Sequence, residues 1–70
     1  MPSEKDHIDN IKMQAIATVD PVKKNSAIDT LEAFGNDAAI DAILAVISST
    51  STPEVHTHGN EAIQRMKRAK

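Results

Sequence analysis

The chain lacks cysteine, tryptophan and tyrosine, and Phe34 is its only aromatic residue. Without cysteine, neither a disulfide framework nor a thiolate metal site can stabilise the fold. The shortage of aromatic residues argues against a β-rich protein, because strands favour aromatic and β-branched side chains. Only two glycines interrupt a sequence in which alanine and isoleucine dominate the apolar residues. This composition predicts an all-α protein.

The sequence also lacks a long apolar segment. Its longest apolar run, from Ala42 to Ile47, is far shorter than the roughly 20 residues that cross a bilayer. The first residues do not combine a basic start with an apolar stretch, so no signal peptide is expected. We therefore expect one domain spanning residues 1–70, located in the cytoplasm and without membrane contact.

Basic charge is scarce except at the C-terminus. The net charge is −2, and four of the eight basic residues lie within the last six positions: Arg65, Lys67, Arg68 and Lys70. A mildly acidic body with a basic tip is not typical of a dedicated nucleic-acid-binding protein. A weak, non-specific nucleic-acid contact through this basic C-terminus is therefore only the alternative function.

Capping residues predict the first two helices. The first begins after Ser3, which forms an approximate capping box with Asp6. The second begins with an N-cap aspartate followed by Pro21 at the first helical position. It ends at Gly35, because glycine adopts the left-handed conformation without steric cost. The apolar spacing of the first helix extends to Val19.

The third helix is expected to begin at Asn36 or Asp37 and to end near Ser48. It is apolar almost all round, which is typical of a helix packed between neighbours. A polar loop follows, and Thr52 with Pro53 repeats the cap-and-proline start for a fourth helix.

The expected fold is four helices in consecutive antiparallel hairpins, with a plain four-helix bundle as the alternative. The predicted core contains Ile8, Ile11, Ala15, Ala27, Ile28, Leu31, Phe34, Ile40, Ile43, Leu44, Ile47, Val55, Ala62, Ile63 and Met66.

Two segments of the sequence are also similar to each other. A shift of 32 positions (53 minus 21) pairs small residues with small and large apolar residues with large: Pro21 with Pro53, Ala27 with Gly59, Leu31 with Ile63 and Phe34 with Met66. The pairing agrees with the predicted helix starts. It predicts repeat-like units over about 20–51 and 52–70, preceded by a degenerate helix over 4–19.

Residues 20–35, with their Asp-Pro start and terminal glycine, resemble the first helix of the short HEAT-like repeat of the phycobilisome-lyase type. Residues 36–47 resemble its second helix, and residues 52–66 resemble the first helix of a further unit. Thr52 departs from the aspartate that the family favours, and His56 stands where the family favours a basic residue. The resemblance implies stacked helical hairpins that mediate protein–protein contacts, without catalytic residues.

No motif for catalysis or for a cofactor is present. The chain has no nucleophile elbow, no glycine-rich phosphate loop and no Cys–His pair. His56 and His58 are two residues apart, so on a helix their side chains point in different directions. We therefore predict no enzyme activity, no cofactor and no metal site.

The sequence thus predicts a non-catalytic interaction or scaffold module that binds another protein. We expect its contact surface at the starts and exposed sides of the second and fourth helices, with Lys23, Lys24, Asn25, His56 and Asn60 as partner-binding residues. Self-association is a second hypothesis, because the nearly apolar third helix can leave an apolar patch exposed. A homodimer would extend the stack of hairpins.

Overall fold

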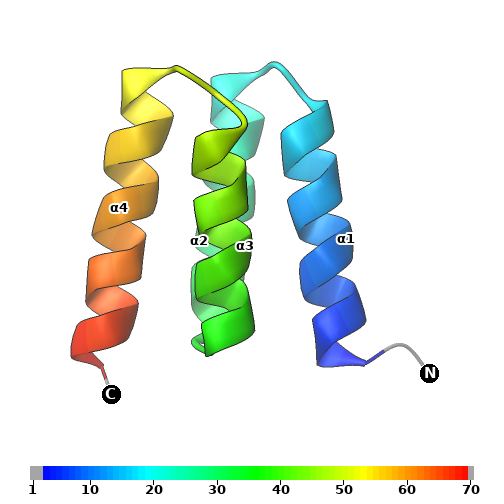
Figure 1. Ribbon diagram of the computed structural model, residues 1–70, viewed down its shortest axis with the longest axis vertical. Helices are drawn as coiled ribbons and strands as arrows, with labels where there is room; N and C mark the ends of the chain where they lie inside the picture. The colour runs from blue at the N-terminus through cyan, green and yellow to red at the C-terminus, as the bar shows by residue number, and fades with distance from the viewer. Residues whose placement is uncertain (1–2, 70) are drawn as a thin grey trace.

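Four α-helices make up the structure (Figure 1). The computed structural model describes residues 3–69. Within them, α1 covers Glu4–Ala17, α2 covers Pro21–Phe34, α3 covers Asp37–Ser48 and α4 covers Pro53–Arg68. No strand occurs in this part of the chain, and the all-α prediction is confirmed.

Side-chain caps define the starts of α1 and α2. Ser3 Oγ accepts a hydrogen bond from the Asp6 amide at 3.2 Å, and the Asp6 carboxylate accepts one from the Ser3 amide at 3.1 Å. Asp20 Oδ1 accepts from the Val22 amide at 2.9 Å. Gly35 ends α2 with a φ of 66°. These interactions confirm the predicted capping box, N-cap and glycine stop.

One helix boundary and one capping interaction differ from the prediction. α1 ends at Ala17, and Val19 lies in the next loop with 94% of its surface exposed. Thr18 leaves the helix with an extended backbone, with ψ at 148°, and its hydroxyl accepts a hydrogen bond from the Asp20 amide at 3.2 Å. Thr52 occupies the N-cap of α4 but makes no capping hydrogen bond. Its hydroxyl instead accepts one from the Thr50 hydroxyl at 3.1 Å. The N-cap of α3 is Asn36.

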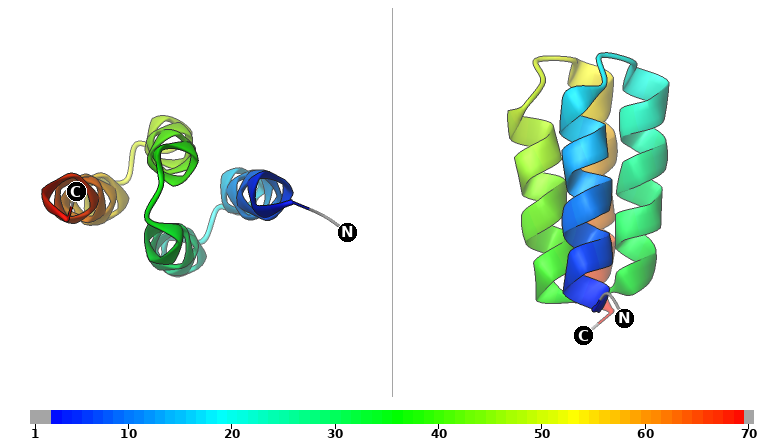
Figure 2. Two further views of the ribbon diagram at one scale, coloured as in Figure 1. Left: turned by 90° about the horizontal axis from the view of Figure 1, so that it is seen from below. Right: turned by 90° about the vertical axis from the view of Figure 1, so that its right-hand side faces the viewer.

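The helices form two layers of parallel pairs. α1 packs beside α3 and α2 packs beside α4, whereas helices that follow one another in sequence run antiparallel (Figure 1). Seen from below, α1 and α4 lie at opposite ends with α2 and α3 between them (Figure 2). Within residues 3–69, α1 makes no contact with α4. The four helices therefore do not surround one central seam, as they would in a plain four-helix bundle.

The core lies along the shared faces of α2 and α3. Most of the predicted core residues are buried or packed against it. The prediction that Leu44 lies in the core is wrong, because 46% of its surface is exposed. α3 packs against α1, α2 and α4, and Leu44 lies on its remaining, solvent-facing side. Three residues of α3 that were left out of the predicted core are buried: Ala39, Ala42 and Val46.

Gly59 lies where α4 crosses close to α2 and α3. A Cβ atom added to it would lie 2.5 Å from Ile47 Cδ1, 2.6 Å from Ile47 Cγ1 and 3.4 Å from Ile28 Cδ1. The first two distances are shorter than real carbon contacts allow. Any larger residue would force the Ile47 side chain to move, so packing inside the chain favours glycine here.

We expect Gly59→Ala to lower the free energy of unfolding by about 1 kcal/mol, measured by urea denaturation. Alanine gains about 0.5–1 kcal/mol of helix propensity over glycine, but overpacking costs about 1–3 kcal/mol. The matched control is Asn60→Ala on the exposed side of α4, which should leave stability equal or slightly higher. In an Ile47→Val background the loss at Gly59 should shrink, and an undiminished loss would show that Ile47 is not the obstacle.

Candidate functional site: an open groove between α1 and α2

The residues predicted to bind a partner do not share one surface. Lys23 and Asn60 are exposed, on α2 and α4 respectively. Asn25 is half-buried, and its Oδ1 atom is buried without a hydrogen-bond partner among the described residues. Lys24 is buried and His56 is half-buried. The five side chains therefore divide between surface and interior.

Lys24 is the clearest correction. Only 4% of its surface is exposed, and its ammonium group donates a hydrogen bond to the Ala15 carbonyl at 2.8 Å. It also lies 3.4 Å from Ser49 Oγ. A cation interacts favourably with the carbonyl end of a helix, so Lys24 ties the start of α2 to the ends of α1 and α3. It is a structural residue and not part of an exposed binding surface.

His56 has the corresponding role in the second hairpin. The 32-residue shift places His56 on Lys24, and His56 Nε2 lies 2.5 Å from the Thr50 carbonyl oxygen. Because a carbonyl oxygen only accepts, Nε2 carries the proton in this contact. Both residues thus bind the chain segment that precedes their own helix. The sequence pairing alone does not reveal the burial of Lys24, because the environment of His56 is itself known only from the structure.

The basic C-terminus offers fewer free cations than the sequence implied. Arg65 forms a two-pronged ion pair with Glu32, with Nε–Oε2 at 2.8 Å and Nη2–Oε1 at 2.9 Å. Lys67 and Arg68 are exposed, and Lys70 lies outside the described residues. Lys23 lies at the opposite end of the molecule, because α2 begins where α4 begins (Figure 1). Lys23 and the exposed basic residues of α4 therefore lie at opposite ends of the molecule.

Two polar side-chain contacts join α2 to α4. Besides Arg65 and Glu32, His58 Nε2 lies 2.6 Å from Asp29 Oδ1. The hydrogen bonds from Arg65 lower the pKa of Glu32 below its ordinary value, against a smaller opposing effect of burial. The same contact raises the pKa of Arg65. Both contacts lie on the solvent side of the seam between α2 and α4, and Gly59 lies in the interior of this seam.

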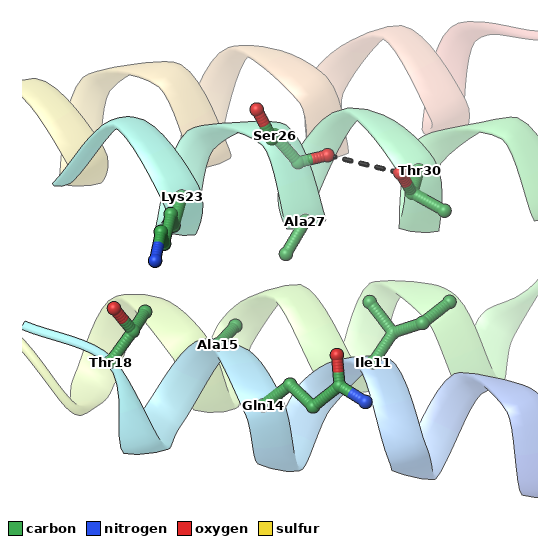
Figure 3. Close-up of a pocket in the computed structure, with 8 residues that line it drawn as sticks. All are labelled: Ile11, Gln14, Ala15, Thr18, Lys23, Ser26, Ala27 and Thr30. Carbon is green, nitrogen blue, oxygen red and sulfur yellow. Dashed lines mark hydrogen bonds between the residues drawn. The ribbon is translucent and has the colours of Figure 1, made fainter. Parts of the chain in front are cut away.

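An open groove lies between α1 and α2 (Figure 3). Its volume is about 360 Å³. Ile11 and Ala15 on α1 face Ala27 on α2 across it. The groove is lined by Ile11, Gln14, Ala15, Thr18, Lys23, Ser26, Ala27 and Thr30. It therefore has an apolar floor, a polar rim and one charged side chain.

The internal repeat explains what this groove is. The 32-residue shift also carries α1 onto α3, with Ile8 on Ile40 and Ile11 on Ile43. The hairpin α1–α2 is thus repeated as α3–α4. In the second hairpin the counterpart groove is filled, because α2 packs against both α3 and α4. We call such a groove, where a third helix packs against a hairpin, a helix seat. The groove between α1 and α2 is a helix seat that no helix of residues 3–69 occupies.

The lining of the open groove is more polar than that of the filled groove. Gln14, Lys23 and Thr30 stand where the second hairpin has Val46, Val55 and Ala62. The three counterparts are buried.

The floor, by contrast, stays apolar. Ala15 corresponds to Ile47 and Ala27 to Gly59. The groove between α1 and α2 thus has an apolar centre, and its edges carry polar side chains that water can solvate. The sequence alone did not reveal the groove, because its openness depends on which helices pack together.

Other kinds of site find no support in residues 3–69. They contain no group of three or more histidine, aspartate or glutamate side chains placed to hold a metal ion. None of the helices in this part combines the length and apolar character needed to cross a membrane. Comparisons with family models, curated proteins and solved structures give no match.

We expect Lys24→Met to lower the free energy of unfolding by about 1–3 kcal/mol, because the buried Ala15 carbonyl loses its hydrogen-bond donor. The neighbouring change Lys23→Met is the control, and it should alter stability by less than about 0.5 kcal/mol since Lys23 is exposed. Thermal unfolding followed by circular dichroism measures both. Equal effects of the two changes would contradict the structural role of Lys24.

The pair of Glu32 and Arg65 makes stability depend on acid pH. The pKa of Glu32 is lower in the folded chain than its ordinary value of 4.5, so the unfolded state takes up the proton first. The stabilisation is complete above pH 4.5 and is lost as the pH falls through the lower, folded pKa. In Arg65→Gln, the titration midpoint of the Glu32 carboxyl carbon, followed by NMR, should rise. An unchanged midpoint would show that the ion pair does not form in solution.

Proposed function

We propose that this chain is a non-catalytic protein-interaction module that binds another protein through the groove between α1 and α2. The observation that carries the proposal is the pairing of grooves within the chain. The groove between α3 and α4 holds a helix, and its counterpart between α1 and α2 is open. Apolar floors with polar rims are typical of sites where one protein binds a segment of another.

The proposal moves the contact surface away from the one expected from sequence. Of the five expected residues, Lys23 alone borders the groove. Asn25, Lys24 and His56 are wholly or partly buried, and Asn60 lies on α4, which does not line the groove. Lys23 is therefore the one expected residue that we keep in the site.

The HEAT-like resemblance and a cytoplasmic location belong to the same proposal. Layered antiparallel hairpins with an internal repeat support the resemblance. The absence of cysteine from the chain is compatible with a reducing compartment. The alternative of nucleic-acid binding loses support, because Arg65 is engaged by Glu32.

The test uses the chain as bait with a groove variant and a control variant. Thr30→Arg places a large cation at the rim of the groove and should reduce capture of a specific partner at least tenfold. Asn60→Arg adds the same charge on α4 and should leave capture intact. Both sites are exposed on helices, so both variants should fold, which circular dichroism checks.

The lysate is treated with nuclease in one arm. Capture that is lost with Asn60→Arg but kept with Thr30→Arg would favour the surface expected from sequence. Capture that depends on nucleic acid and survives Thr30→Arg would overturn the proposal.

A further inference from the structure

We infer that the element seated in the groove between α1 and α2 is an amphipathic α-helix of a partner protein that runs parallel to α2. We infer further that it places a branched apolar residue over Ala27 and a carboxylate opposite Lys23. The inference rests on the proposed function and gives the bound segment its direction and chemistry.

The direction follows from the filled groove. There the seated helix is α2, which runs parallel to α4 and antiparallel to α3 (Figures 1 and 2). In the open groove α2 takes the place of α4, and α1 takes the place of α3. A helix seated in the same way is therefore parallel to α2 and antiparallel to α1.

The apolar contact follows from Ile28. In the filled groove, Ile28 packs over Gly59, with its Cδ1 atom 3.4 Å from the position of an added Cβ. Gly59 corresponds to Ala27 in the open groove. Ala27 already carries that Cβ, so the incoming helix sits slightly further out. A branched apolar residue at the position of Ile28 would cover Ala27 and displace water from the floor of the groove.

The charged contact follows from the seam between α2 and α4. The seated α2 supplies the acids, Asp29 and Glu32, and the seat supplies the bases. One helical turn before the contact between Asp29 and His58, position 25 of α2 is level with the first turn of α4. That turn contains Val55, whose counterpart is Lys23. Lys23 is the one charged residue among those lining the groove, and the lining has no carboxylate. An acid at the position equivalent to Asn25 therefore complements the seat.

A second copy of this chain does not meet these requirements. In a head-to-tail assembly, α4 of the second copy would take the place of the seated helix. Its outward side carries Asn60 where α2 carries Ile28, and Gln64 where α2 carries Glu32. Asn60 would bring an amide to the apolar floor, which is unfavourable for a polar group that finds no hydrogen-bond partner. α4 of a second copy therefore fits the groove less well than a partner helix with an apolar residue at the position of Ile28 and an acid at the position of Asn25.

The probe is a synthetic peptide with the sequence of residues 18–36 and the change Asn25→Glu. It is titrated at millimolar concentration into the isotope-labelled full chain and followed by NMR. We expect chemical-shift changes at the amides of Ile11, Ala15, Ala27 and Thr30. A further change in the peptide, Ile28→Asn, should weaken binding at least tenfold. Reversal of Asn25→Glu should weaken it severalfold.

A spin label tests the direction. A nitroxide at the N-terminal end of the peptide should broaden the Lys23 signal more than the Thr30 signal, and a C-terminal label should do the opposite. Thr30→Arg in the protein should abolish the shifts, and Asn60→Arg should not. The reverse broadening pattern, shifts centred on α3 and α4, or no shifts at several millimolar peptide would each overturn the inference. Dilution-dependent shifts of the same amides without peptide would assign the groove to a second copy and overturn it too.

The two proposals fail in different ways. If Thr30→Arg abolishes partner capture while the peptide does not bind, the interaction function stands and the inference about a parallel helix falls. If the peptide binds as expected while Thr30→Arg leaves capture of the partner protein unchanged, the groove binds a helix but the proposed function falls.

Discussion

The close packing of α4 against α3 and α2 at Gly59 is the constraint on which the architecture depends. A chain of 70 residues without cysteine has only helix packing to stabilise it. With no side chain at position 59, Ile28 and Ile47 fill the space between three helices. The contacts of Asp29 with His58 and of Glu32 with Arg65 lie along the outer edge of the same seam. A bulkier residue at position 59 would separate the layers and weaken these contacts together.

Polar groups at the helix ends hold the hairpins in place. Lys24 and His56 occupy equivalent positions, and each binds a backbone carbonyl in the segment that precedes its helix. Buried polar groups of this kind are costly unless paired, so they favour one arrangement of the hairpins over others. Asn36 adds a link between the starts of α1 and α3, since its amide donates to the Glu4 carboxylate and its Oδ1 caps α3.

The two ends of the stack differ in chemistry, and this difference points to function. At the α4 end the outward side is polar, with Asn60 and Gln64 exposed. At the α1–α2 end the groove keeps the apolar floor of a helix seat. One end is thus suited to water and the other to a further helix. This asymmetry supports the proposal that the groove binds a helix of a different protein.

The sequence by itself determined the helices, because caps and stops act locally. Ser3, Asp20 and Gly35 satisfy or terminate backbone hydrogen bonds within a few residues, so their effect is readable from the chain alone. Only the tertiary structure decided which equivalent residues are buried and which are exposed. Lys23 and Lys24 are adjacent and chemically identical, and their opposite environments depend on where α1 and α3 end. Long-range packing creates that difference, as it creates the open groove, and no local pattern of residues encodes it.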